Sequence, residues 1–172
     1  KDTSGTLVVA KNGVVHHHLA KQFKQRTIEK RYLALVWGEP IKDSGTILLP
    51  IGRHPVHRKQ MSTTGRKTRS AETIWQVRER FDGMTLLEVI LKTGRTHQIR
   101  VHCAAVSHPI IGDPVYGRRR MNKGQVRASR QMLHAWRLGF IHPATGGWVT
   151  FESPVPEDME EIIERLRQEN KV

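Results

Sequence analysis

Two apolar segments joined by Asp82-Gly83 constrain the fold of this chain more than any other feature. Residues 71–81 and 84–92 both have strand composition, and Asp-Gly between two such segments is the strongest short-range signal for a β-hairpin. Residues 133–141 and 148–153, which flank a turn at 143–147, indicate a second hairpin. We therefore expect antiparallel strands, paired mainly as hairpins, to form much of the sheet.

The remaining segments predict three helices and further strands. Apolar residues at a spacing of four predict a helix over residues 14–26, and residues 95–107 have helical composition. Early acidic and late basic residues predict a closing helix over 156–168. Strands are predicted over 6–11, 30–37 and 45–49, and loops over 53–69 and 112–117. About seven strands and three helices favour an α+β fold with a mixed, largely antiparallel β-sheet and flanking helices.

The chain is long enough for one domain and is strongly basic. Its 172 residues include 29 lysines and arginines against 16 aspartates and glutamates, a net charge of +13. This excess favours a polyanionic partner, of which nucleic acid is the commonest. No apolar run approaches the ~18 residues of a membrane span. The single Cys103 excludes an intrachain disulfide framework and fits a reducing compartment, so we expect a cytoplasmic protein.

Common catalytic and cofactor motifs are missing from the sequence. The ten histidines show no recognisable metal-ligand spacing with Asp, Glu or Cys, so they are interpreted as surface and RNA-facing side chains. There is no GxSxG motif, and Cys103 lies among apolar residues, which predicts a buried, unreactive thiol. The chain also has neither GxxxxGKS/T nor GxGxxG, so dependence on ATP or NAD is not expected.

Two clusters of basic residues are candidates for binding nucleic acid. The first lies in residues 53–69, where no acidic residue is present to pair with it, and the second lies in residues 118–130. Such clusters neutralise phosphates and release counterions, although a solvated charged surface is the alternative. The basic residues are Arg53, Arg58, Lys59, Arg66, Lys67 and Arg69 in the first cluster, and Arg118, Arg119, Arg120, Lys123, Arg127 and Arg130 in the second.

Residues 93–102 are the densest functional signal in the chain. Gly94 precedes a predicted helix start, where free backbone N–H groups with Arg95 and Arg100 would form an anion site. Arg100 falls near the edge of the apolar face of this helix and therefore needs a carboxylate or phosphate partner. A structural ion pair and a functional role are both open for it. Tyr32 is one of two tyrosines, either a core aromatic or a platform for base stacking.

Short motifs along the chain also occur in a recognisable order. KDTSG at 1–5 matches the end of a HRLDxxTSG signature, KRYLA at 30–34 matches a tyrosine strand, and GRTHQIRVH at 94–102 is the most specific match. RHP at 53–55, HPI at 108–110, GDPVYG at 112–117 and LHA at 133–135 complete the series. Together they resemble the RluA-type pseudouridine synthases, especially those that modify large-subunit ribosomal RNA. The resemblance implies a single catalytic domain over 1–172 that lacks upstream strands and the catalytic-Asp loop.

The resemblance also implies an activity, a partner and roles for individual residues. The family converts uridine in RNA into its C-glycoside isomer without a cofactor, using an essential Asp, a tyrosine that packs on the target base and an arginine that pairs with the carboxylate. By motif position the last two are Tyr32 and Arg100. Base flipping is implied because the base must leave its stack. The implied partner is RNA, ribosomal RNA in particular, with no membrane or nucleotide cofactor, and a monomer is favoured. The implied RNA-binding residues are Arg53, Arg58, Lys59, Arg66, Lys67, Arg95, His97, Arg118 and Arg119, and the structural motif residues are Thr3, Ser4, Gly5, Gly94, Thr96, Gln98, Asp113, Tyr116, Leu133 and His134.

One departure from the family pattern concerns the catalytic carboxylate. The family's Asp falls immediately before Lys1, and Asp2 is not its equivalent, because two residues along a strand move a carboxylate by about 6–7 Å. We therefore expect residues 1–172 alone to be inactive, with Arg100 holding an orphan charge or a solvent anion and with an unpaired sheet edge. The alternatives are a non-catalytic RNA-binding module on the same scaffold and a nuclease, although no acid–base pair or metal site supports the latter.

Overall fold

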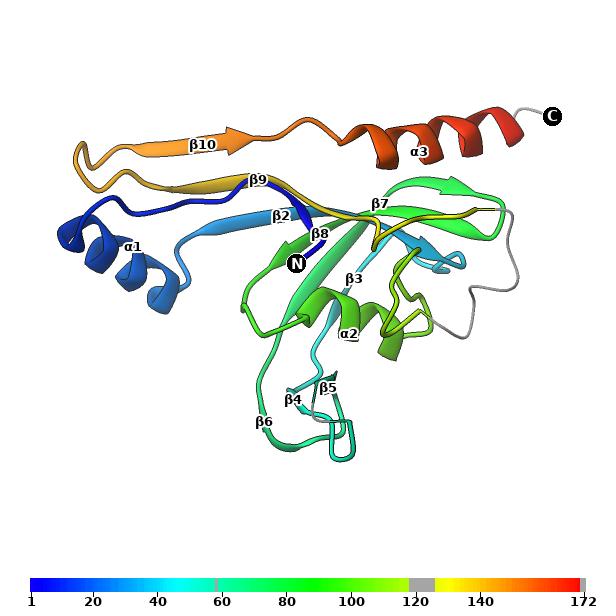
Figure 1. The fold of residues 1–172 in the computed structure, drawn as a ribbon, viewed down its shortest axis with the longest axis horizontal. Helices are drawn as coiled ribbons and strands as arrows, with labels where there is room; N and C mark the ends of the chain where they lie inside the picture. The colour runs from blue at the N-terminus through cyan, green and yellow to red at the C-terminus, as the bar shows by residue number, and fades with distance from the viewer. Residues whose placement is uncertain (58, 118–125, 171–172) are drawn as a thin grey trace.

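The computed structural model describes residues 1–57, 59–117 and 126–170 and confirms the predicted α+β class (Figure 1). A large sheet lies between α3 on one face and α2 with a second, small sheet on the other, while α1 lies at one end of the molecule. The elements are β1 (Ser4–Gly5), α1 (Gly13–Gln25), β2 (Glu29–Trp37), β3 (Ser44–Ile47), β4 (Ile51–Arg53), β5 (Met61–Ser62), β6 (Arg66–Arg69), β7 (Thr73–Phe81), β8 (Met84–Leu91), α2 (Gln98–Ala105), β9 (Leu133–Ile141), β10 (Trp148–Glu152) and α3 (Glu157–Glu169).

The large sheet has seven strands in the order β1-β9-β2-β8-β7-β3, with β10 also paired to β9. Only the β1–β9 pair is parallel among the described strands. The two predicted hairpins are present as β7–β8 and β9–β10. The centre of the sheet is different, because β2 pairs with β8 and β9, both of which lie far from it in the sequence. The expectation that strands pair mainly as hairpins is therefore wrong for the middle of the sheet.

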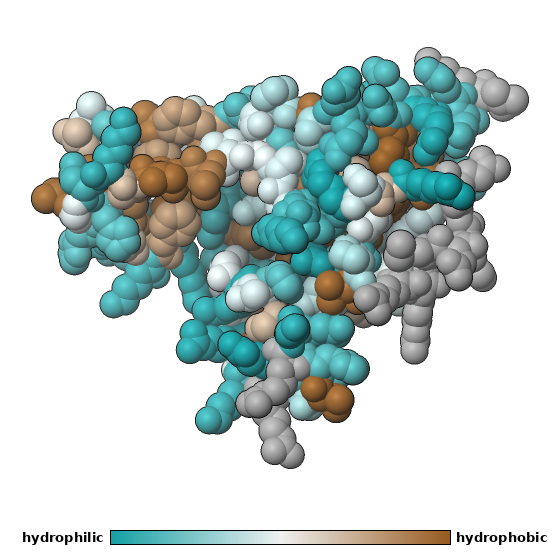
Figure 2. Space-filling view, viewed as in Figure 1, coloured by the Kyte–Doolittle hydropathy of each residue, from teal (hydrophilic) through white to brown (hydrophobic). Residues whose placement is uncertain are grey.

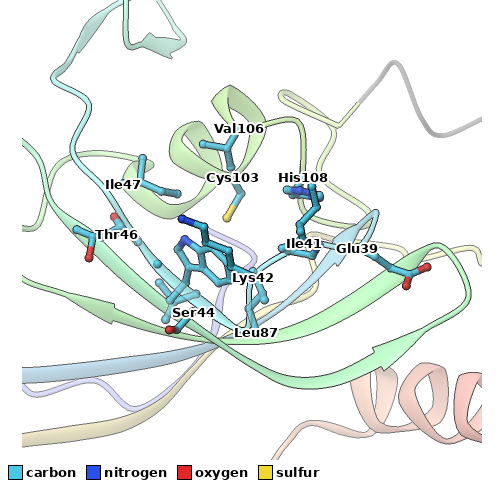
Figure 3. Close-up of a pocket in the computed structure, with 15 residues that line it drawn as sticks. Glu39, Ile41, Lys42, Ser44, Thr46, Ile47, Leu87, Cys103, Val106 and His108 are labelled. Carbon is cyan, nitrogen blue, oxygen red and sulfur yellow. The ribbon is translucent and has the colours of Figure 1, made fainter.

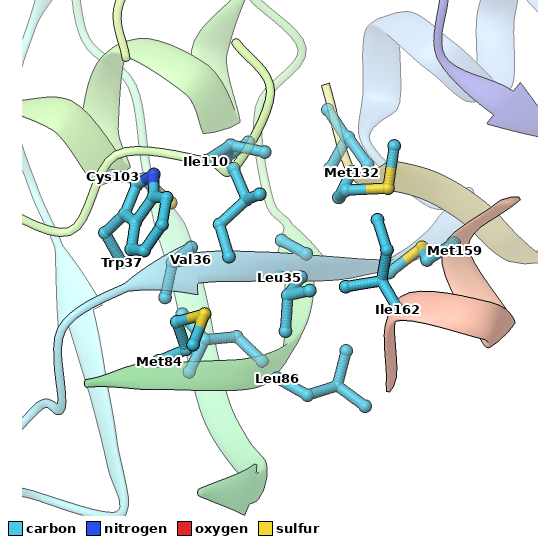
Figure 4. Packing of buried hydrophobic residues seen from close by; sticks show 14 of the residues in the cluster. Leu35, Val36, Trp37, Met84, Leu86, Cys103, Ile110, Met132, Met159 and Ile162 are labelled. Carbon is cyan, nitrogen blue, oxygen red and sulfur yellow. The ribbon is translucent and has the colours of Figure 1, made fainter. Parts of the chain in front are cut away.

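The main hydrophobic core fills both faces of the central strands. Met159, Ile162, Ile163 and Leu166 of α3 are buried in the same cluster as Ile99 and Cys103 of α2. Figure 4 shows β2 running between the group around Ile110 and the group around Met159 and Ile162. The predicted apolar stripe of α3 is thus buried, and its acidic first turn and basic last turn match the helix dipole.

A second, smaller core lies at the end of the molecule formed by α1 and the β9–β10 hairpin. Asn12 caps α1 by accepting a hydrogen bond from the backbone N–H of Val15 at 2.9 Å. The helix buries Leu19 against Ile28 and Leu138. Figure 2 shows apolar side chains on the surface of this end, where Val14 and Phe23 of α1 and Ile141, Trp148 and Phe151 of the hairpin are exposed. Among the described residues, no helix is both long enough and apolar enough to cross a membrane.

The predicted strand over residues 6–11 is not formed. Only Ser4 and Gly5 pair with β9, and after a hydrogen bond from the Thr6 N–H to the Ala135 carbonyl at 2.8 Å the chain leaves the sheet. The reason is competition for one strand edge: β10 pairs with β9 from residue 137 onward, on the edge that β1 occupies at 134 and 135. The alternating apolar residues pack instead through Val8 and Ala10 on the second core, while Leu7 and Val9 are exposed.

The basic segment 53–69 is not the loop that its composition predicts. It belongs to a three-stranded sheet with the order β5-β4-β6, which we call the small sheet. Ile51 of β4 is buried against Ala71 and Val101 and ties the small sheet to α2. Short strands of polar residues have no apolar periodicity, which is why the sequence did not indicate them. Arg58, Arg118 and Arg119, predicted to bind RNA, lie outside the described residues.

Candidate active site

A pocket of about 420 Å³ lies between the first residues of the chain, β2, β8 and the start of α2, and we call it the α2 pocket. It brings together side chains that are far apart in the sequence. Tyr32, Arg95, His97, Gln98 and Arg100, all singled out from the sequence, line it together with residues 1–3. The motifs around the tyrosine strand, the segment 94–102 and the N-terminus therefore converge on one place.

The N-terminal segment is held at this pocket by the motif residues Ser4 and His134. Ser4 pairs with His134 in the parallel β1–β9 ladder, and its hydroxyl lies 2.9 Å from Nδ1 of His134. The Nε2 of His134 lies 3.1 Å from the Ser153 carbonyl, which can only accept, so Nε2 carries the proton. Gln131, which sequence reasoning missed, donates to the Lys1 carbonyl at 2.9 Å and to the Thr3 hydroxyl at 3.3 Å.

Gly5 and Leu133, two further motif residues, lie in the same pair of strands, β1 and β9, that holds the N-terminal segment at the pocket. A Cβ on Gly5 would lie 2.2 Å from the Ala135 carbonyl oxygen, and its φ of +115° is a region that glycine alone enters readily. Leu133 is buried and lines the α2 pocket. The close approach of β1 to β9 therefore requires glycine at this position.

Gln98 organises the turn that leads into α2. Its Oε1 accepts from the Thr93 hydroxyl at 2.8 Å and from the Arg95 N–H at 3.0 Å. Its Nε2 donates to the Glu72 carbonyl and to the Thr73 hydroxyl, both at 2.9 Å. Because this side chain holds the backbone in a turn, the helix begins at Gln98 and not at residue 95 as predicted. Gly94 and Thr96 are exposed, and a Cβ on Gly94 would meet nothing within 4 Å.

Arg100 forms a buried ion pair with Asp113. Its Nε and Nη2 donate to the two carboxylate oxygens, each at 2.7 Å. Asp113 has no solvent exposure and also accepts from the backbone N–H groups of Val115 and Tyr116, each at 2.9 Å. Burial alone would raise the pKa of Asp113, but the hydrogen bonds from Arg100 and from these two amides outweigh it and lower the pKa.

The expected orphan charge on Arg100 is therefore wrong. The sequence had left a structural ion pair open, and Asp113 provides it, 13 residues further along the chain. Asp113 engages only one edge of the guanidinium, because Nη1 of Arg100 makes no hydrogen bond to any described residue. Arg100 also lines the α2 pocket, and Nη1 is a donor that Asp113 leaves unused.

Tyr32 reaches the α2 pocket from β2. Burial raises the pKa of its phenol above the usual value, so the phenol is protonated at neutral pH. Its hydroxyl makes no hydrogen bond to any other residue in the described parts of the chain. Tyr32 thus brings a neutral phenol to the wall of the pocket.

His97 and Tyr116 form a hydrogen-bonded pair at the edge of the same pocket. The Tyr116 hydroxyl lies 3.0 Å from Nδ1 of His97 and accepts from the Met61 N–H of β5 at 2.9 Å. The Tyr116 ring packs 5.0 Å from the guanidinium carbon of Arg100. Burial and the charge of Arg100 lower the pKa of His97. The motif around residue 116 therefore connects the small sheet to the pocket.

Only some of the predicted RNA-binding cations lie in the part of the chain that the structure describes. Arg53, Lys59 and Lys67 are exposed on the small sheet and its loop, and Arg95 lies at the pocket with its Nε on the Ser70 carbonyl at 3.1 Å. Arg66 lies in β6. Arg53, Lys59 and Lys67 form no salt bridge with a described acidic residue.

The histidines are not all surface side chains as predicted. His102 and His134 are buried, and His102 bridges the Thr73 hydroxyl at 2.8 Å and the Leu49 carbonyl at 2.9 Å. These contacts make both side chains structural. Within the described parts of the chain, no group of three or more His, Cys, Asp or Glu residues could hold a metal ion.

A larger cavity of about 530 Å³ lies on the other side of α2, against β3, β7 and β8 (Figure 3). Its lining is mainly apolar, with Trp75, Leu87 and Val106 among the side chains. Cys103 points into it from α2, and burial raises the pKa of this thiol to about 12. The predicted buried thiol is confirmed. The α2 pocket is the better candidate site because Tyr32, His97 and Arg100, all singled out from the sequence, line it.

Comparison with known proteins identifies the class to which this fold and pocket belong. The family profile described as RNA pseudouridylate synthase matches residues 1–105, more than half of the chain. The chain belongs to this family, whose members are RNA-modifying isomerases.

Individual relatives agree with this assignment. The chain is 47% identical to ribosomal large subunit pseudouridine synthase D of Nitrosomonas europaea over 97% of this chain and 49% of that protein. It is 48% identical to the uncharacterized RNA pseudouridine synthase YlyB of Bacillus subtilis over 98% of this chain and 54% of that protein. The chain thus spans about half the length of the curated relatives it matches. The solved structure of human RNA pseudouridylate synthase domain containing 1 superposes with a TM-score of 0.74 at 29% identity, covering 96% of this chain and 76% of the human one.

Proposed function

We propose that residues 1–172 form most of the catalytic domain of an enzyme that isomerises specific uridines to pseudouridine in large-subunit ribosomal RNA. The observation that carries the proposal is the α2 pocket, whose wall holds Tyr32, Arg100 and the first residues of the chain. The similarity to a ribosomal large subunit pseudouridine synthase supports the choice of RNA. The exposed cations of the small sheet support a polyanionic substrate.

The catalytic carboxylate is proposed to come from the residue that precedes Lys1 in the family signature. The β1–β9 pairing and Gln131 hold residues 1–4 at the α2 pocket. A residue joined to the N-terminal side of Lys1 would therefore lie next to this pocket. Nη1 of Arg100, which binds none of the described residues, would donate to this carboxylate while Asp113 holds Nε and Nη2. A neighbouring cation keeps a carboxylate ionised, as a nucleophile or a base requires.

Tyr32 is proposed to pack on the flipped uracil and to relay a proton. With its pKa raised by burial, Tyr32 acts as a neutral phenol and not as a phenolate. The reaction breaks the bond from the ribose C1′ to N1 and forms a bond from C1′ to C5. The C5 proton is lost to solvent and N1 gains one, so the isomerisation balances without a co-reactant. The base must leave the RNA stack to enter the pocket.

The test compares two proteins on ribosomal RNA labelled with tritium at C5 of uridine. One protein is the chain 1–172, and the other is the same chain extended upstream through the expected Asp. Release of tritium by the extended protein, lost when that Asp is replaced by Asn, is the expected result. Robust release by residues 1–172 alone would refute the assignment of the carboxylate. RNA affinity that does not fall as salt is raised would refute the RNA surface.

A non-catalytic RNA-binding module is the second candidate, and the Arg100–Asp113 pair favours it. This pair satisfies the buried guanidinium without a further carboxylate, so the pocket does not need the catalytic Asp for its stability. On this reading the extended protein would bind ribosomal RNA with salt dependence but release no tritium. The two candidates are therefore separated by the same pair of measurements.

A further inference from the structure

Tyr116 connects three parts of the molecule through one side chain. Its hydroxyl contacts Nδ1 of His97 at the α2 pocket and the N–H of Met61 on the small sheet. Its ring lies against Arg100 and meets the His97 imidazole edge-on, with the ring centres 5.8 Å apart. Its own N–H is bound by Asp113. One hydroxyl thus joins β5 to the side chain that holds His97.

The position of the shared proton follows from counting donors and acceptors. The phenol has one proton, and the Met61 N–H already donates to its oxygen. If Nδ1 of His97 also carried a proton, the phenol proton would have no acceptor among the described residues. A half-buried donor without an acceptor is costly. The arrangement that satisfies both residues has Tyr116 donating to Nδ1, which leaves the imidazole proton on Nε2.

His97 is held in an unusual conformation that presents this ring to the pocket. Its φ of 56° lies in the left-handed region, which is strained for a residue other than glycine, and it directly precedes α2. Burial and the charge of Arg100 favour the neutral ring, and Asp113 opposes them. Nε2 of His97 makes no hydrogen bond to any described residue, although His97 lines the α2 pocket.

We infer that His97 donates a hydrogen bond from Nε2 to an oxygen of the target nucleotide, and that Tyr116 is the positioning residue that sets this tautomer. The inference rests on the proposed function for the ligand, since a flipped nucleotide brings such an oxygen into the pocket. The backbone N–H of Met61 on the small sheet also donates to the Tyr116 hydroxyl and helps to fix its position.

The tautomer is measured first, on the chain 1–172 without RNA. Long-range proton–nitrogen correlation spectra at pH 7.5, with His97→Gln used to assign the signals, report which ring nitrogen carries the proton. The expected result is a neutral His97 with the proton on Nε2. Tyr116→Phe keeps the ring and removes the hydroxyl, and the expected result is a mixture of the two tautomers. A proton on Nδ1, or a doubly protonated ring, in the unmodified chain would overturn the inference.

The contribution to the reaction is measured on the upstream-extended protein. His97→Ala is expected to lower kcat/KM by about two- to tenfold, the effect of one lost hydrogen bond. The amide of Gln in His97→Gln reaches the position of Nε2, so this variant is expected to have a higher kcat/KM than His97→Ala, although lower than that of the native protein. Tyr116→Phe is expected to lower kcat/KM in the native background and to add nothing to His97→Ala. The matched control is His17→Gln on the exposed face of α1, which is expected to change nothing.

The acceptor oxygen is identified with modified substrates. In RNA that carries 2-thiouridine or 4-thiouridine at the target position, the thiocarbonyl is a weaker acceptor. The effect of His97→Ala is expected to shrink with one of them if a uracil carbonyl accepts, and to persist with both if a phosphate does.

If neither His97→Ala nor Tyr116→Phe changes kcat/KM while the native protein turns over normally, the inference fails and the proposed function stands. If the tautomer is as expected but the extended native protein releases no tritium, the proposed function fails, and with it the donor role of His97, while the tautomer assignment stands.

Discussion

Replacing Asp113 by asparagine tests the ion pair on which the pocket depends. Asparagine keeps the size of the side chain but removes the charge and one of the two acceptor oxygens that Arg100 uses. The Arg100 side chain is 10% exposed and that of Asp113 is fully buried. Removing one partner of a buried pair costs about 3–5 kcal/mol. Because the Arg100 side chain lines the α2 pocket and keeps some solvent exposure, we expect the lower end, about 3 kcal/mol.

Unfolding of the chain 1–172 in urea at pH 7 measures this cost. The midpoint is expected to fall with an unchanged m-value, and the thermal midpoint to fall by about 6–12 °C. The control is Asp158→Asn, which removes the partner of Arg130 at a site where the carboxylate is 41% exposed. A loss of about 1 kcal/mol or less is expected there. Equal losses in the two variants would refute the argument that burial makes the Asp113 pair strong.

The Asp113→Asn variant is also expected to differ from the native chain in how its stability depends on pH. The folded-state pKa of Asp113 is lowered, so its stabilisation is present above the unfolded-state value of about 3.9 and is lost as pH falls through the folded value. The native chain is therefore expected to lose more stability than the variant as pH is lowered below about 4. A variant that loses stability as steeply as the native chain in this range would contradict the assignment.

Three further predictions follow from the geometry. Tyr32→Phe is expected to leave RNA binding intact and to lower turnover in the extended protein by about 10²-fold or more, measured by tritium release. Gly5→Ala is expected to destabilise the chain by about 1–3 kcal/mol in urea unfolding, because its φ and its contact with Ala135 both exclude a Cβ, whereas Gly94→Ala is expected to change little. Lys59→Ala is expected to weaken binding about equally across RNA sequences and to reduce the salt slope by about one, measured by RNA titration at several salt concentrations.

Elements with a local signal were predictable from the sequence. The hairpin at Asp82-Gly83, the helix predicted over 14–26 and the amphipathic closing helix all form within a few residues of their predicted bounds. In each case the residues that determine the structure are neighbours in the chain, so turn chemistry and periodicity report it directly. The failures lie where the partner is distant. Residues 6–11 have strand composition but lose their edge of β9 to β10.

The candidate site divides in the same way. Tyr32, Arg100, Gln98 and Asp113 were all identified as motif residues, yet the pairing of Arg100 with Asp113 was not predicted. Charge and spacing show that a guanidinium needs an anion but not which carboxylate the fold brings within 2.7 Å. Gln131, which fastens the start of the chain, carries no sequence signal at all.

The amino-acid sequence by itself determined the secondary-structure elements with local signals, the basic character of the chain and the residue types of the pocket. Only the tertiary structure decided which strands pair, which carboxylate neutralises Arg100 and that Tyr116 joins the small sheet to His97. The physical reason is that these contacts depend on the packing of the whole chain around one core. Their free energy belongs to pairs of residues that no local pattern relates.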